Sequence, residues 1–133
     1  MKQEHLVPLA PQAVAILREL QTLPGFGSSP FLFPSPSREG YMSNNTMLYA
    51  MYRMGYHGRA TVHGFRAMAS TALNEMGFRP DVIERQLAHR ERNAVRASYN
   101  RAEYLSERRA MMEYWADQLD VLAGANVVAF GVR

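Results

Sequence analysis

Two histidines, an arginine and a tyrosine in the middle of the chain are the side chains best suited to chemistry. His63 and Arg66 lie three residues apart, so on a helix they project from one face and can hold the same small anion. His89 follows Arg66 after 23 residues, and Tyr99 follows His89 after ten. Imidazole gains or loses a proton near neutral pH, and the planar fork of arginine fits phosphate oxygens. These residue types therefore indicate a site for a phosphate-bearing partner.

Each of these residues also has a structural explanation. His63 can be a helix-end histidine that is bonded to the backbone, and Arg66 by itself can be an ordinary surface residue. His89 can close a helix, where a cationic ring interacts favourably with the carbonyl end of the dipole. Only the combined spacing of the set favours the functional interpretation.

Basic residues are concentrated in the middle of the chain. The chain has 15 Lys and Arg against 12 Asp and Glu, and only one of these basic residues is a lysine. Residues 53–101 contain four acidic residues and nine arginines, which are Arg53, Arg59, Arg66, Arg79, Arg85, Arg90, Arg92, Arg96 and Arg101. This segment should bind the phosphate-bearing partner. The alternative is a solvated helical surface.

Composition excludes several classes of protein. The chain has no cysteine, which rules out a disulfide scaffold and a thiolate zinc site. His5 and His57 have no partner at metal-ligand spacing, so we expect no metal. No apolar run approaches the roughly 18 residues that cross a bilayer, and no secretory signal is visible at the start. We therefore expect a cytoplasmic protein that does not interact with membranes.

Apolar periodicity and helix-end residues predict a mainly α fold with about five helices, a residual short strand and a strand-like tail. The inward face of the last helix should include Tyr104, Met111 and Trp115. The expected helices are Pro11–Gln21, a segment from Ser43 or Asn44 to Gly55 with Met47, Met51 and Met54 on one stripe, Thr61–Met76, a helix opening at Pro80, a short one from Asn93 to Ser98, and Arg101–Ala123.

These elements predict a single partial domain over residues 1–133. Residues 1–10 should form a remnant hairpin strand, and residues 22–42, rich in proline, glycine and serine, should form a loop. Residues 61–123 should provide the helices that build the site. Residues 124–133 should form a tail with strand propensity.

Two runs of sequence resemble the tyrosine recombinases of the phage integrase family. Residues 81–89 read DVIERQLAH and residues 99–104 read YNRAEY. The chain is most similar to integrases of satellite phages and genomic islands, over most of its length, and matches the carboxy-terminal half of the catalytic domain. His63, Arg66, His89 and Tyr99 together at the family spacing would occur by chance in roughly one in ten thousand chains.

The resemblance implies site-specific DNA integration or excision through a 3′-phosphotyrosyl intermediate. Tyr99 would be the nucleophile, and Arg66 would hold a nonbridging phosphate oxygen. His63 and His89 would donate hydrogen bonds to the phosphate or accept the phenol proton. The resemblance implies no metal or cofactor, and the bond to the protein conserves the energy for rejoining, so that no ATP is needed. Tyr104 and Tyr114 are weaker candidates for the nucleophile, since Tyr104 fits the apolar stripe of the last helix.

The resemblance also implies that double-stranded DNA is the partner. Arginines around Tyr99 would contact backbone phosphates, with a solvated loop as the alternative. Relatives assemble into a tetrameric synapse on DNA, and the tail at Val127–Phe130 is suited to adding a strand to another subunit. The expected DNA-binding residues are Arg59, Arg90, Arg92, Arg96 and Arg101.

Two catalytic residues of the family have no match in this sequence. The family has an earlier arginine, which nothing before His5 can supply, and a hairpin lysine, for which Lys2 lies too close to Pro8. The sequence therefore predicts a piece of an integrase that is impaired or inactive alone. The alternative is a non-catalytic module that binds DNA or another subunit, and a helical protein-interaction domain without a DNA role is a third interpretation.

Overall fold

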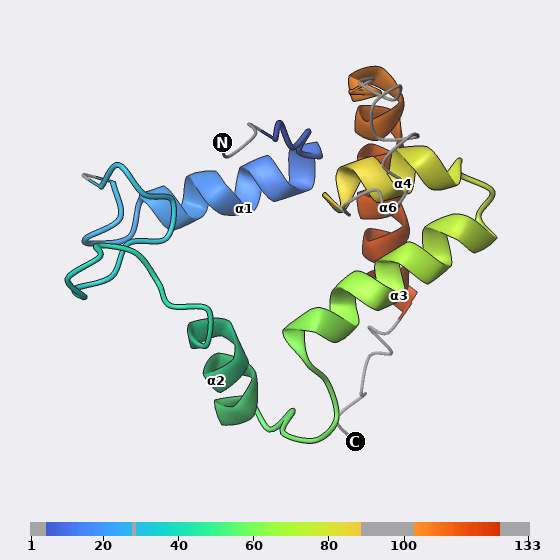
Figure 1. Ribbon diagram of the computed structural model, residues 1–133. Coiled ribbons are helices and arrows are strands. Elements are labelled where there is room, and N and C mark those ends of the chain that lie inside the picture. The colour runs from blue at the N-terminus through green and yellow to red at the C-terminus, as the bar shows by residue number, and fades with distance from the viewer. Residues whose placement is uncertain (1–4, 28, 89–102, 126–133) are drawn as a thin grey trace, which may run out of the picture. The chain divides into compact units, whose positions relative to one another are not determined.

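The computed structural model describes residues 5–27, 29–88 and 103–125, and in these ranges the chain is helix and loop (Figure 1). The mainly α fold predicted from the sequence is confirmed. The helices of this part of the chain are α1 (Pro11–Gln21), α2 (Thr46–Arg53), α3 (Val62–Glu75), α4 (Pro80–Gln86) and α6 (Leu105–Ala125). The chain divides into two compact units, one of residues 1–13 with 77–133 and the other of residues 14–76.

In the first unit, α4 packs against α6 and the core forms along this contact. Val82 and Ile83 of α4 and Met111 of α6 are at most 2% exposed. Beside them, the rings of Phe78 and Tyr114 pack with their centroids 5.5 Å apart. Apolar side chains from a short helix and a long one thus fix the position at which α4 ends.

The short strand predicted for residues 1–10 is not formed in residues 5–10, which have an irregular conformation. A strand is stable only when a neighbouring strand accepts its hydrogen bonds. Here the carbonyl of Leu6 accepts a hydrogen bond from the Arg108 side chain of α6 instead. Further along, the Gln12 amide donates to a carboxylate oxygen of Asp117 at 2.8 Å, which fastens the start of α1 to α6.

In the second unit, the sequence predicts the end of α2 and the bounds of α3 better than the start of α2. That helix begins at Thr46, after Asn45, which makes no side-chain cap bond, and not directly after Ser43 or Asn44. Gly55, one residue beyond the cap of α2, has a φ of 86°, a left-handed conformation that glycine adopts without cost. Thr61 caps α3 with its side chain. Met51 of α2 and Leu73 of α3 are buried. The predicted bounds of α1 are confirmed, and α3 agrees with its prediction within one residue at each end.

The last helix begins later than predicted, at Leu105 instead of Arg101. Tyr104 has a φ of 45°, so it lies in the left-handed region and cannot continue a right-handed helix. Ala88 has a φ of 49° and is the other non-glycine residue with a positive φ in the described ranges. These two residues flank residues 89–102, which are outside the described part, as is the short helix predicted there.

The conformation of Ala88 predicts an unusual response to glycine. A left-handed alanine costs roughly 1–2 kcal/mol, which offsets the 0.5–1 kcal/mol that glycine loses in conformational entropy. We expect Ala88→Gly to leave the free energy of unfolding unchanged or to raise it by up to about 1.5 kcal/mol. Ala110→Gly, on an exposed position inside α6, should lower it by about 1 kcal/mol. Urea titrations of the two variants would contradict the assigned conformation if both lost equal stability.

Candidate functional site

His63 and Arg66 both lie in the first turns of α3. The Oγ1 of Thr61 accepts a hydrogen bond from the Gly64 backbone N–H at 3.0 Å, which starts the helix directly before His63. A Cβ on Gly64 would lie only 3.2 Å from this oxygen, so glycine suits the position. His63 is exposed and Arg66 is half-buried. One helical turn therefore separates the two side chains, as the sequence predicts, and they share a face of α3.

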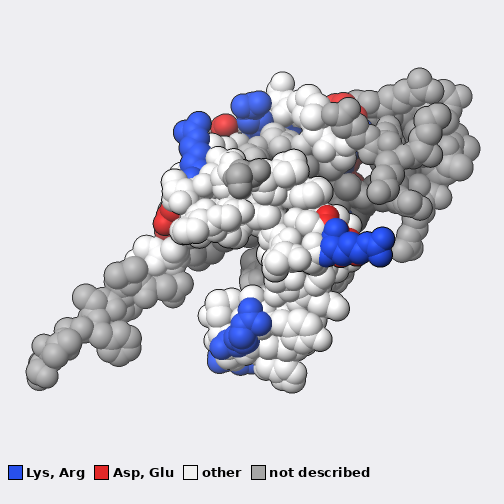
Figure 2. Space-filling model, turned by 90° about the vertical axis from the view of Figure 1, so that its left-hand side faces the viewer, with Lys and Arg blue, Asp and Glu red and all other residues white. Residues whose placement is uncertain are grey.

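The electrostatic surroundings of these two residues favour an anion. Residues 40–74 contain no Asp or Glu, and α3 has no acidic residue in its first turn. Because the N–H groups at a helix amino terminus carry partial positive charge, negative groups are stabilised there. In Figure 2 some Lys and Arg side chains have acidic side chains beside them, whereas the lowest group of basic side chains in the view has none. An acid-free stretch with the positive end of a helix suits a phosphate.

The loop before α3 holds Arg59, one of the predicted DNA-binding residues. Its backbone N–H donates to the Tyr56 carbonyl at 3.0 Å, which closes a turn, and the residue is exposed. His57, for which the sequence offered no role, packs against Tyr52 with the ring centroids 4.3 Å apart. The aromatic contact fixes the start of the turn and leaves Arg59 accessible to a partner.

The remaining predicted site residues lie outside the described ranges. They are His89, Arg90, Arg92, Arg96, Tyr99 and Arg101. The structure thus places His63 with Arg66 on one helix and Arg59 in the preceding loop. The predictions for the other six residues, and for the tail at Val127–Phe130, stay predictions.

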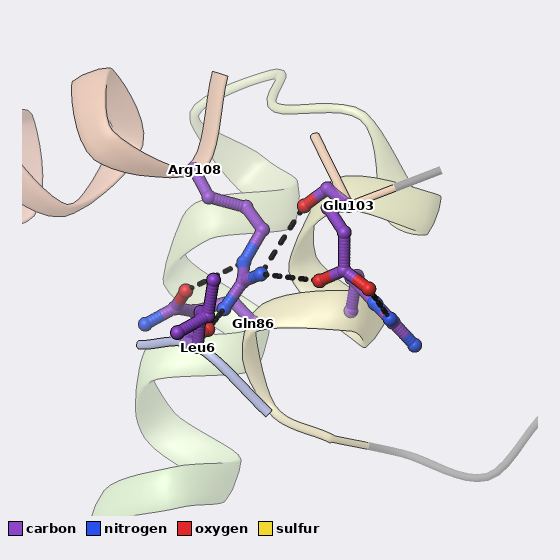
Figure 3. A network of polar contacts seen from close by, with 5 residues as sticks. Leu6, Gln86, Glu103 and Arg108 are labelled. Carbon is purple, nitrogen blue, oxygen red and sulfur yellow. Dashed lines mark hydrogen bonds and ion pairs between the residues drawn. The ribbon is translucent and has the colours of Figure 1, made fainter. Parts of the chain in front are cut away.

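A buried arginine that was not expected from the sequence contacts the chain both before and after residues 89–102. Arg108 of α6 has no exposed surface. Its Nε donates to Oε1 of Gln86 at 2.9 Å, one terminal nitrogen donates to the Glu103 backbone carbonyl at 3.1 Å, and the other donates to the Leu6 carbonyl (Figure 3). The Glu103 carboxylate lies 3.7 Å from Arg108 and forms an ion pair with Arg85.

Burial has the largest effect on the pKa of Arg108. It lowers the pKa of the guanidinium from its ordinary value, the Glu103 carboxylate opposes this change, and the nearby charge of Arg85 adds to it. An arginine nevertheless stays protonated at neutral pH, so α6 carries a charge within its packed face. The sequence contained a signal for this feature, because Arg108 falls three residues before Met111 on the predicted inward stripe.

Tyr104 has a different role from the one predicted. It precedes α6 instead of lying on its inward stripe, and the Arg79 guanidinium stands over its ring at 5.2 Å from the centroid. Arg79 also pairs with Asp81 at 2.7 Å and with Glu107 at 3.2 Å. Partial burial acts to raise the pKa of Asp81, but hydrogen bonds from Arg79 and Tyr104 outweigh it and hold that pKa below its usual value. Tyr104 is therefore bound to α4 by both its ring and its hydroxyl.

The described residues contain neither a cluster suited to a metal ion nor a membrane-spanning helix. No group of three or more His, Cys, Asp or Glu side chains in this part of the chain is placed to hold a metal ion. No helix among the described residues is long and apolar enough to cross a membrane.

Comparison with known proteins gives one consistent result. The sequence model of the phage integrase family matches residues 1–105. "Prophage integrase IntA" of Escherichia coli K12 is 44% identical over 129 residues, which cover 96% of this chain and 31% of the relative. The "Integrase" of Enterobacteria phage P4 is 48% identical over 126 residues, 91% of this chain and 28% of the relative. The chain thus spans less than a third of these two relatives, and no solved structure matches it.

Proposed function

Because this chain belongs to the phage integrase family, we propose that it cleaves and rejoins DNA in site-specific recombination, as part of a larger integrase. One observation carries the proposal: His63 and Arg66 lie one turn apart at the amino-terminal end of α3, inside a stretch without acidic residues. That arrangement supports the binding of a phosphodiester oxygen, since it supplies a bidentate cation, an imidazole and helix N–H groups together.

In the proposed reaction the phenol oxygen of Tyr99 attacks a backbone phosphorus atom. The bond from phosphorus to the 5′ oxygen breaks, that oxygen takes up a proton from water, and the 3′ phosphate becomes joined to Tyr99. His63 or His89 accepts the phenol proton, while Arg66 stabilises the charge that develops on the phosphate oxygens. Attack by the 5′ hydroxyl of another strand reverses the step. One phosphoester bond replaces another at each stage, so the reaction needs no nucleotide as a source of energy.

Positions outside this centre would hold the duplex. We assign phosphate contacts to the exposed Arg59 and to the arginines on either side of Tyr99, since such contacts fix orientation without reading sequence. Self-association within a tetrameric synapse on DNA is part of the same proposal. The assigned arginines are Arg59, Arg90, Arg92, Arg96 and Arg101.

Duplex DNA with a nick beside the cleavage point tests this function. We expect binding that weakens roughly 10²-fold between about 50 and 200 mM salt, if about four arginines contact phosphates. We also expect a covalent protein–DNA adduct on a denaturing gel, because the released fragment diffuses away from the nick. Salt-dependent binding without an adduct would favour the module that binds and does not cleave. No salt-dependent affinity for DNA would contradict both and favour a protein-interaction domain.

A further inference from the structure

The chain on either side of residues 89–102 is held at one place in the first unit. Before this segment, Gln86 ends α4 and accepts a hydrogen bond from Arg108. After it, Glu103 accepts from the same Arg108 through its backbone carbonyl and pairs with Arg85, 18 residues earlier in the chain. A single buried guanidinium thus holds both ends of the segment, together with the Leu6 carbonyl (Figure 3).

The burial of Arg108 restricts what it can do. A guanidinium without exposed surface cannot reach a DNA phosphate, so Arg108 differs in kind from the arginines assigned to DNA contact. Two of its acceptors are backbone carbonyls, which fix the path of the main chain and not merely the side chains. The five N–H groups of arginine have a fixed planar geometry that a lysine ammonium cannot reproduce.

The backbone conformation before and after residues 89–102 supports a functional role for the contacts that hold the chain there. Ala88 and Tyr104 are the non-glycine residues of the described ranges that have positive φ. Ala88 directly precedes residues 89–102, and Tyr104 follows them after Glu103. Such residues persist only where surrounding contacts hold them, and they gather at functional sites. At Tyr104 the contact is visible, because Arg79 of the α4 cap stands over its ring.

We propose that Arg108 and Glu103 are positioning residues for DNA cleavage, because they fix the two ends of the segment that carries His89 and Tyr99. His89 follows Gln86 by three residues and Tyr99 precedes Glu103 by four, so chain length keeps them within about 10 and 14 Å of these anchors. The anchors limit the positions that the phenol and imidazole can take. The claim that these two residues affect DNA cleavage rests on the proposed function. The claim that they hold the two ends of the segment does not.

Three variants of the full chain test the proposal. Arg108→Lys keeps the charge but removes the fork, and Glu103→Gln removes the ion pair with Arg85 while keeping the backbone acceptor. Glu107→Gln is the matched control, since it removes the same charge from an exposed Arg–Glu pair and leaves Arg79, which holds Tyr104, its second ion pair with Asp81. Circular dichroism checks the fold of each variant. If Arg108→Lys does not fold, Glu103→Gln decides the outcome.

The first measurement does not depend on catalysis. We expect amide hydrogen exchange in residues 89–102 to accelerate about tenfold in Arg108→Lys and Glu103→Gln, and to stay within about twofold of wild type in Glu107→Gln. Exchange in α6 around the buried Met111 serves as the reference for the stability of the first unit and should not change. Equal exchange of residues 89–102 in Glu103→Gln and Glu107→Gln would overturn the proposal, whether or not the chain cleaves DNA.

The second measurement separates positioning from binding. At saturating nicked duplex, the rate of adduct formation should fall about tenfold in Glu103→Gln, because small displacements of reacting groups are costly. The DNA dissociation constant should match that of Glu107→Gln within about twofold, since both variants lose one negative charge. Equal adduct rates in these two variants would overturn the positioning role. If the wild-type chain forms no adduct, the proposed function fails, and hydrogen exchange still decides whether the anchors hold the segment.

Discussion

Replacing Tyr99 with phenylalanine should abolish the covalent protein–DNA adduct completely, while the dissociation constant for the nicked duplex stays within about twofold of wild type. The phenol oxygen is the atom that would bond to phosphorus, and phenylalanine lacks it, so no slower form of the same reaction remains. The ring itself is kept. A labelled nicked duplex that is incubated with the chain and run on a denaturing gel measures the adduct, and a gel shift measures binding.

The structure supplies matched controls for this experiment. Tyr104→Phe removes a hydroxyl that bonds Asp81, and Tyr114→Phe removes one beside the packing contact with Phe78. Both tyrosines have structural roles in the first unit, so both variants should still form the adduct. An adduct that survives in Tyr99→Phe and disappears in Tyr104→Phe would contradict the assignment of the nucleophile.

Helix ends could be predicted from the sequence where a local residue determines them. Thr61 caps α3 because its side chain accepts a hydrogen bond from the Gly64 backbone N–H, three residues on. Gly55 follows the cap of α2 in a left-handed conformation that needs no tertiary contact. The start of α6 has another cause. Tyr104 takes a left-handed conformation while it contacts Arg79, which is 25 residues away in the sequence, and periodicity contains no information about such a contact.

Non-local contacts also explain the other difference between expectation and structure. An apolar segment near Leu6 has the composition of a strand, yet a strand forms only beside a partner. In the described residues the Leu6 carbonyl bonds a side chain of α6. Composition predicted a strand here but not which group would donate a hydrogen bond to the Leu6 carbonyl.

In the candidate site, too, features set by local sequence could be predicted and features set by distant contacts could not. The pairing of His63 with Arg66 follows from helical spacing, which a sequence reveals directly. Arg108 was missed because an arginine on an apolar stripe is normally read as a break in the pattern. The structure shows it satisfied by Gln86, Glu103 and Leu6, from three different parts of the chain. A charge at a predicted core position is therefore better treated as a sign of a buried polar network.

Arg66→Ala should lower the rate of adduct formation at saturating DNA by about 10³-fold or more. An arginine that stabilises a phosphoryl-transfer transition state contributes roughly 10³ to 10⁵ in rate. Its contribution to DNA binding should be much smaller, because one phosphate contact changes the slope of affinity against salt by only about one. Single-turnover rates at saturating duplex, together with binding titrations, separate the two effects.

One further variant shows whether geometry or charge at Arg66 matters, and another is a control for the loss of an arginine elsewhere. Arg66→Lys keeps the positive charge but not the planar fork, so it should recover only part of the lost rate. Arg18→Ala, at an exposed position on α1, removes an arginine of the same unit that has no place in the proposed site, and it should react as wild type. Because Arg66 is half-buried, thermal melts of its variants must show that they stay folded. An Arg66→Ala variant that binds DNA more weakly but reacts at the wild-type rate once saturated would make Arg66 a binding residue only. The amino-terminal turn of α3 would then hold the DNA without taking part in its cleavage.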